Sequence, residues 1–168
     1  MKKIKIFISS VQKEFEKERF VLLDFFNTDV LLKSFFEPFI FEKIAANTKD
    51  PENVYKPEVK KSDIYLGLFG KEYGYEDKNG ISPTEMEYET AKNKGIPRWI
   101  YILKTNSKRH PKEDNLIKKV SGDVSWKFFK GIKNLKKEVY HTCIEFLKQK
   151  GKIENNEFDY DFVVLERQ

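Results

Sequence analysis

Residues 63–70 read Asp-Ile-Tyr-Leu-Gly-Leu-Phe-Gly, and this stretch decides the fold class. Residues 64–69 are all apolar or glycine, whereas a strand with one face in water would alternate between polar and apolar residues. A continuous apolar run of this length is typical of a strand that is covered on both faces, as in a parallel sheet between helices. We therefore predict a central buried strand over residues 63–70.

Strand and helix patterns alternate on both sides of this strand. Residues 3–8 predict a first strand that ends at Ser9 and Ser10. From Val11 onward apolar residues recur at helical spacing, with Ser10 available as the N-cap. The further predicted elements are strands over 34–41, 98–103 and 126–129, a short helix over 51–60, a helix from Ser82 to Gly95, and a long amphipathic helix over 132–147. This alternation predicts a parallel sheet with helices on both faces.

The chain of 168 residues is long enough to bury its own hydrophobic core. We expect one domain over residues 1–152, and residues 153–168 as a C-terminal extension, either an edge strand or a linker to a further domain. A cytoplasmic location without membrane contact is expected, because no apolar run is of membrane-spanning length and the N-terminus leads into a strand. The single Cys143 and two distant histidines, His110 and His141, provide neither a disulfide nor zinc-ligand spacing, so no metal is expected.

Positive charge gathers in the second half of the chain. Residues 104–152 hold fourteen lysine or arginine residues against five acidic ones, within a net charge of +5. Such an excess could attract nucleic acid or phosphates, but no arginine-rich or groove-reading motif accompanies it. We favour a solvated lysine face over a nucleic-acid site. The sequence also lacks the glycine-rich and P-loop motifs and an acidic pair after the first strand, which argues against a dehydrogenase, a P-loop NTPase and a receiver domain.

The predicted topology locates a candidate site before any motif is considered. Open parallel sheets bind ligands at the carboxyl ends of their strands, where the winding of the sheet reverses. This rule selects Ser9 and Ser10, Glu42, the loop over 70–75, and the first turns of the helix after Ser82.

Three glutamates at alternate positions follow Ser82. The stretch Ser82-Pro83-Thr84-Glu85 has the form of a capping box, in which the Ser82 hydroxyl caps the amide of Glu85 and Glu85 reaches back to the Ser82 amide. Glu89 shares a helix face with Glu85, and we expect it to be solvated. Glu87 lies instead on the face of the small Ala91, where burying a carboxylate is costly and needs a reason.

Three blocks of the sequence resemble a known family. Ile-Phe-Ile-Ser-Ser at 6–10, Ser-Asp-Ile-Tyr-Leu-Gly at 62–67 and Ser-Pro-Thr-Glu-Met-Glu at 82–87 are similar to an uncharacterised bacterial family of TIR-like domains, related in fold to nucleoside 2-deoxyribosyltransferases. Together with the alternation of elements, the resemblance implies an α/β, flavodoxin-like or TIR-like three-layer domain with a mostly parallel five-stranded sheet. In the deoxyribosyltransferases the nucleophilic glutamate precedes an alanine by four residues and a glycine by eight, which is the position of Glu87 before Ala91 and Gly95.

The resemblance implies a nucleotide- or nucleoside-binding domain that cleaves or transfers an N-glycosidic bond, with Glu87 as the key carboxylate. A glutamate with an ordinary pKa of about 4.3 is ionised at neutral pH and can stabilise or trap an oxocarbenium-like transition state. Ser9 and Ser10 could then hold phosphate or ribose oxygens, Tyr73 or Tyr75 could stack on a base, and Gly70 belongs to the same predicted ligand-binding loop. No cofactor is expected, although NAD is one candidate substrate.

A second hypothesis remains open on the sequence alone. The chain could be a non-catalytic sensor, or a module that associates with itself or with a partner domain, at the N-terminus of a larger regulatory or defence protein. The environment of Glu87 discriminates between the two, because a carboxylate that faces a pocket beside Ser9 favours catalysis.

Overall fold

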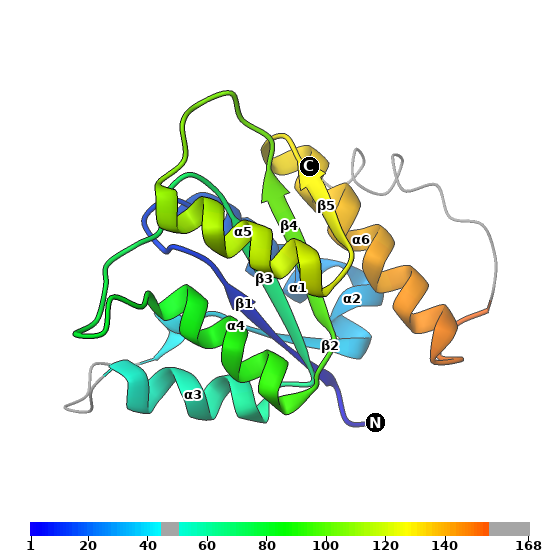
Figure 1. Ribbon diagram of the computed structural model, residues 1–168. Coiled ribbons are helices and arrows are strands. Elements are labelled where there is room, and N and C mark those ends of the chain that lie inside the picture. Colours follow the sequence, from blue (N-terminus) through cyan, green and yellow to red (C-terminus); the bar gives the residue numbers. More distant parts are fainter. Residues whose placement is uncertain (45–50, 155–168) are drawn as a thin grey trace. The chain divides into compact units, whose positions relative to one another are not determined.

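Five parallel strands form the sheet at the centre of the fold. The structure is a computed structural model that describes residues 1–44 and 51–154 (Figure 1). The strands are β1 (Ile4–Ser9), β2 (Phe36–Phe39), β3 (Ile64–Phe69), β4 (Arg98–Leu103) and β5 (Trp126–Phe129), in the order β2-β1-β3-β4-β5. In this register Ser9 lies opposite Gly67, and Phe69 lies opposite Ile102. The central strand is β3, and every one of its residues is buried, which confirms the prediction from its apolar run.

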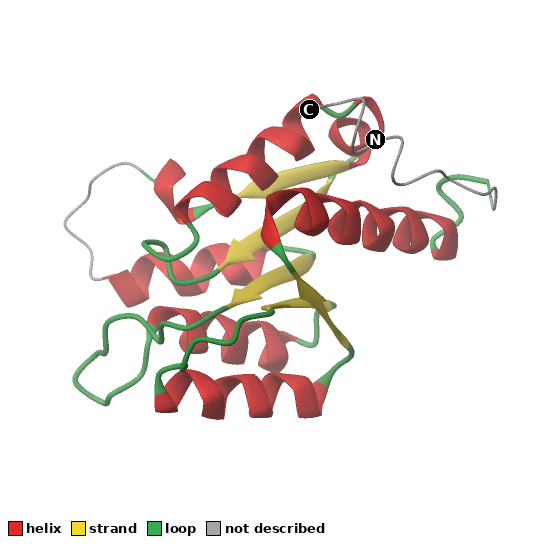
Figure 2. Ribbon diagram, turned by 90° about the horizontal axis from the view of Figure 1, so that it is seen from above, coloured by secondary structure: helices red, strands yellow, loops and turns green. Residues whose placement is uncertain are grey.

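The chain divides into two compact units, Met1–Phe128 and Phe129–Gln168. The first unit contains helices on both faces of the sheet, with α3, α4 and α5 on one face and α1 and α2 on the other (Figures 1 and 2). This arrangement confirms the predicted flavodoxin-like three-layer α/β fold. The helices are α1 (Glu16–Thr28), α2 (Val30–Phe35), α3 (Pro51–Lys61), α4 (Pro83–Lys94) and α5 (Pro111–Asp123), and a 3-10 turn covers Phe41–Lys43.

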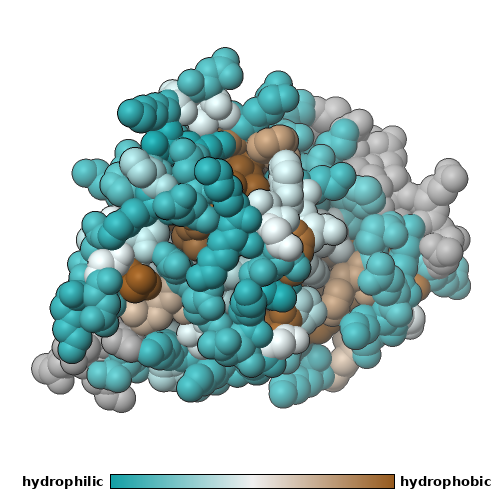
Figure 3. Space-filling model, in the orientation of Figure 1, coloured by the Kyte–Doolittle hydropathy of each residue, from teal (hydrophilic) through white to brown (hydrophobic). Residues whose placement is uncertain are grey.

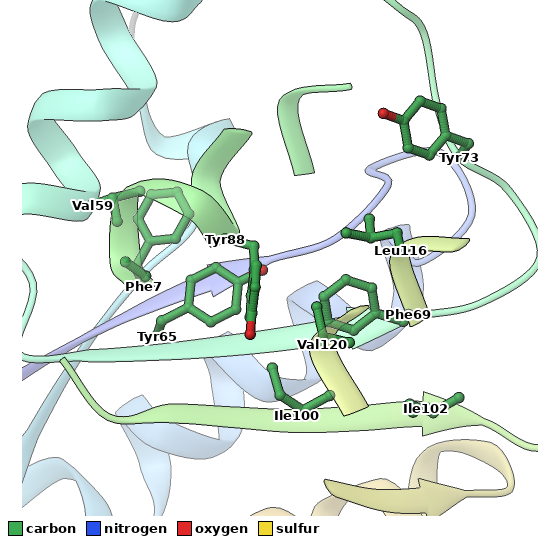
Figure 4. Close-up of a cluster of buried hydrophobic side chains, with 11 residues drawn as sticks. Phe7, Val59, Tyr65, Phe69, Tyr73, Tyr88, Ile100, Ile102, Leu116 and Val120 are labelled. Carbon is green, nitrogen blue, oxygen red and sulfur yellow. The ribbon is translucent and has the colours of Figure 1, made fainter. Parts of the chain in front are cut away.

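Side chains alternate between the two faces of β3, as strand geometry requires. Tyr65 and Phe69 pack into one cluster with residues of α3, α4 and α5, among them Tyr88 and Leu116 (Figure 4). Tyr73 lies at the edge of the same cluster, on the loop that follows β3. Helix α4 is therefore fixed against the middle of the sheet, and its first turns lie near the carboxyl ends of the strands.

The described part of the second unit is mainly α6 (Gly131–Gln149). Its buried apolar residues recur three or four positions apart, which confirms the predicted amphipathic helix. They are Leu135, Val139, Tyr140, Cys143, Ile144 and Leu147. The predicted extension is described only as far as residue 154, so the apolar run at 162–165 lies outside the described residues.

Three predicted elements need correction. Helix α1 begins at Glu16 and not at Val11, and the Ser10 hydroxyl accepts a hydrogen bond from Arg19 in place of capping a helix. The predicted strand over 34–41 shortens to β2, because Asp29 caps the amides of Leu31 and Leu32 and starts α2 in front of it. Helix α5 was not predicted.

The face drawn in Figure 3 carries mainly hydrophilic side chains, with small separate hydrophobic areas. In the described parts of the chain, none of the helices combines the length and the apolar character that a membrane span requires.

Candidate functional site

A cleft of about 1050 Å³ lies where the chain leaves the carboxyl ends of β1 and β3. Strands β2 and β3 flank β1 on opposite sides, so the winding of the sheet reverses here, as it does at the ligand sites of open α/β sheets. The cleft belongs entirely to the first unit. Its walls are residues 10–14, Glu16, Arg19, Glu42, Tyr55, residues 71–75, Pro83, Thr84, Glu87 and His110.

Glu87 lies in the wall of this cleft, on the second turn of α4. Its side chain is only 6% exposed, and Ser9 at the end of β1 donates a hydrogen bond from Oγ to Oε2 of Glu87. Burial raises the pKa of Glu87 to about 7; the Ser9 hydrogen bond and the charge of Arg19 act in the opposite direction, and the charge of Glu42 adds to the rise. The expectation of an ordinary glutamate pKa is therefore wrong, because removal from water disfavours the charged form.

Arg19 is the second buried charge at the cleft, and it was not among the predicted site residues. Its guanidinium donates from Nε and Nη2 to the two carboxylate oxygens of Glu42 at 2.7 and 2.8 Å. The remaining nitrogen, Nη1, donates to Oγ of Ser10 at 3.0 Å and to the carbonyl of Ile8 at 3.3 Å. Arg19 thus ties the end of β1 to Glu42.

The sequence did contain a signal for this role. Arg19 is four residues after Phe15 and three before Leu22, so it interrupts the apolar stripe of its helix, where an arginine must be buried. Burial raises the pKa of Glu42, but the hydrogen bonds and the charge of Arg19 outweigh it, and the pKa is lowered overall. Among the carboxylates of the cleft, Glu42 therefore has a lowered pKa and Glu87 has a pKa raised to about 7.

The loop after β3 places its two tyrosines differently. Tyr73 is 3% exposed and stacks on His110, with ring centroids 6.0 Å apart. Its ring is thus packed into the wall, which does not match the expected role of an accessible platform for a base. Tyr75 is 60% exposed, and its hydroxyl lies 3.2 Å from that of Tyr55 on α3. Tyr75 therefore provides exposed aromatic surface at the cleft, next to the buried Tyr55.

Gly70 was predicted to contact a ligand, but its near neighbours belong to the protein. A Cβ at this position would overlap the Glu14 carboxylate and lie 2.6 Å from Cζ of Phe15. The Gly70 amide donates to Oε1 of Glu113 at 3.2 Å. Burial raises the pKa of Glu113 to about 8, and the charge of Glu14 contributes to this rise, while the Gly70 amide and Arg109 oppose it.

The first turn of α4 is capped with help from the loop. Oγ of Ser82 accepts from the amide of Glu85 at 3.2 Å. Glu85 does not reach back to the Ser82 amide as predicted, because that amide donates to the hydroxyl of Tyr73 at 3.2 Å, and Tyr73 in turn donates to Glu85. Glu85 and Glu89 both pair with Lys119 of α5, whereas Glu87 lines the cleft and accepts from Ser9.

The described residues contain no candidate metal site. Across 1–44 and 51–154, no three histidine, cysteine or acidic side chains are grouped so that they could hold a metal ion.

Comparison with known proteins shows the family of this chain and a solved structure that is similar to it. A family model described as a domain of unknown function (DUF4062) matches residues 5–151. The crystal structure of a conserved protein from Enterococcus faecalis V583 is similar over 89% of this chain and 99% of that chain, with 16% sequence identity and a TM-score of 0.46. A search of curated proteins found no significant match.

Proposed function

The chain belongs to the DUF4062 family, and we propose that it binds a nucleoside or nucleotide and cleaves or transfers its N-glycosidic bond through Glu87. The relation to TIR-like domains and nucleoside 2-deoxyribosyltransferases, inferred from the three sequence blocks, is part of this proposal. In this function Glu87 is the catalytic residue, and Ser9 and Arg19 are positioning residues.

One observation carries the proposal: a buried carboxylate faces a large cleft and not the interior of the helix layer. Glu87 lines the cleft beside Ser9, which is the environment that favours catalysis over a purely structural role. Burying a carboxylate without a cationic partner is costly, and perturbed carboxylates in clefts mark functional sites. Its neighbours Glu85 and Glu89, which pair with Lys119, carry no such cost.

The chemistry follows from the position of the carboxylate. Cleavage of a base from ribose develops positive charge at C1′, which an adjacent ionised carboxylate stabilises or captures as an ester. As the carboxylate oxygen bonds to C1′, the C–N bond breaks and the base leaves with its electron pair. Water or a second base then attacks C1′ and releases Glu87. Ser9 donates a hydrogen bond to Oε2 of Glu87, and we assign the bond to C1′ to Oε1.

The second carboxylate, Glu42, has a different role. Glu42 is bound on both oxygens by Arg19, which lowers its pKa and keeps it ionised. Its negative charge contributes to the raised pKa of Glu87, while Arg19 acts in the opposite direction. Two carboxylates with pKa values that are pushed apart are a recurring arrangement in acid and base catalysis.

The test is base release, followed by chromatography, from NAD, NADP and a panel of nucleosides and deoxynucleosides. We expect release by the wild type, loss of at least about a hundredfold in Glu87→Gln, and retention in Glu89→Gln. Glu89 is the matched control because it lies on the same helix and pairs with Lys119. Equal activity of wild type and Glu87→Gln would refute the role of Glu87. Silence of the folded wild type on the whole panel would favour the sensor or interaction module.

A further inference from the structure

Two consecutive backbone amides after β3 converge on one carboxylate. The amide of Lys71 donates to both oxygens of Glu14, at 2.5 and 3.1 Å, and the amide of Glu72 donates to Oε2 at 2.7 Å. Successive amides that point at one anion form the type of concavity that binds phosphate in many nucleotide sites. Here the anion is a side chain of the protein itself, from the segment between β1 and α1.

The neighbouring glycine makes room for this carboxylate. Gly70 has no positive φ, so its backbone does not require glycine. A Cβ at residue 70, however, would overlap Oε1 of Glu14 and Cζ of Phe15. The absence of a side chain at residue 70 and the acceptor at residue 14 therefore form one arrangement, in which the glycine leaves the space that the carboxylate fills.

Glu14 shares the cleft with Glu87. Glu14, Lys71 and Glu72 all line the same cavity of about 1050 Å³ as Glu87 and Arg19. A ligand phosphate brought to the Lys71 and Glu72 amides would meet donors that are already bonded and a negative charge in contact with them. Like charges in contact repel, and a partly dry cleft screens them less than bulk water does. The buried cation of the cleft, Arg19, is already paired with Glu42.

We infer that Glu14 is a built-in anion that fills a phosphate-type site at the Lys71 and Glu72 amides, and that it selects uncharged nucleosides over nucleotides that carry a phosphate. The assignment of a substrate class rests on the proposed function. The inference that Glu14 occupies the amide site does not rest on the proposed function, and it can be tested without measuring catalysis. Glu14 is accordingly a specificity-determining residue and takes no part in bond cleavage.

The direct test is calorimetric titration of the full chain with inorganic phosphate. Wild type should show no saturable binding in the millimolar range, and Glu14→Ala should bind at least tenfold more tightly than wild type. Glu16→Ala is the matched control, because Glu16 also lines the cleft and carries the same charge, but accepts neither loop amide in the structure. It should behave as wild type. Glu14→Gln keeps the side-chain shape and removes the charge, so it should bind phosphate severalfold more tightly even if Glu14→Ala does not fold.

Two outcomes would overturn the inference. Equal phosphate binding by wild type and the Glu14 variants would mean that Glu14 does not block the site. No binding by folded Glu14→Ala and Glu14→Gln would mean that the two amides are not an anion site.

A kinetic test then addresses the substrate class, with adenosine and AMP as probes. Wild type should release adenine from adenosine with a kcat/KM at least tenfold above that for AMP, and Glu14→Ala should reduce this ratio at least fivefold while Glu16→Ala leaves it unchanged. A wild type that prefers AMP would overturn the selectivity. If neither probe is cleaved, the proposed function fails for these substrates, and the phosphate titration still decides the occupancy of the amide site.

Discussion

Replacing Glu87 by glutamine should stabilise the protein at pH 8 far more than at pH 5. The pKa of Glu87 is about 7 in the folded protein, against 4.5 for a glutamate in water, because the side chain is almost fully buried. Between these two values the folded state holds the proton more tightly than the unfolded state. The free energy of unfolding of the wild type therefore falls as the pH rises from 4.5 to 7, and then levels off.

The size of the effect follows from the same two values. The raised pKa corresponds to about 3 kcal/mol of lost stability once Glu87 is ionised, of which roughly 2 kcal/mol is lost between pH 5 and pH 8. Glutamine has a similar shape, can accept the hydrogen bond from Ser9, and carries no charge at either pH. The gain in stability of Glu87→Gln over wild type should thus be about 2 kcal/mol larger at pH 8 than at pH 5.

Urea unfolding of both proteins at pH 5 and pH 8 measures this difference. Glu89→Gln is the control on the same helix, and its half-exposed pair with Lys119 should change stability by no more than about 1 kcal/mol at both pH values. An identical gain for Glu87→Gln at pH 5 and pH 8 would show that the carboxylate is not perturbed. A stability loss at pH 8 would show that ionised Glu87 has a favourable partner in the fold.

Three more outcomes are expected. Base release should rise with pH between about 6 and 8, because attack needs ionised Glu87; a rate that falls over this range in a pH–rate profile would assign Glu87 to proton donation. Arg19→Met should lower the free energy of unfolding by about 3 kcal/mol in urea titrations, because it leaves Glu42 without its partner, and an unchanged midpoint would contradict the structure. Ser82→Ala should cost about 1 kcal/mol by the same measurement through loss of the α4 cap, and no loss would show that the cap is not needed.

Local signals were sufficient to predict the elements with strong patterns. The run at 63–70 gave β3 to within one residue at each end, and β4 and β5 have the predicted bounds. Helix α4 starts after Ser82 and ends at Gly95, whose φ of 75° is the left-handed conformation that glycine favours. Each of these signals depends on residues close together in the chain.

The features that were not predicted depend on contacts between residues that are far apart in the chain. Apolar spacing from Val11 fits a helix, but residues 10–14 form the cleft wall instead, and Glu14 reaches amides 57 and 58 residues away. Helix α5 buries only Glu113, Leu116 and Val120. Two buried apolar residues in a lysine-rich segment are too few to predict a helix from apolar spacing. The position of Glu87 could be predicted from its helix face, whereas its raised pKa required knowledge of what surrounds it.

Tyr73 couples the loop after β3 to the first turn of α4. Its hydroxyl, on the loop between β3 and α4, accepts from the Ser82 amide and donates to Glu85, so the first turn of α4 is completed by a side chain from outside the helix. Loop opening and fraying of this turn should therefore occur as one cooperative event, with amides that exchange hydrogen together. Because Glu87 lies one turn further along, we expect such an opening also to change the wall of the cleft beside Glu87.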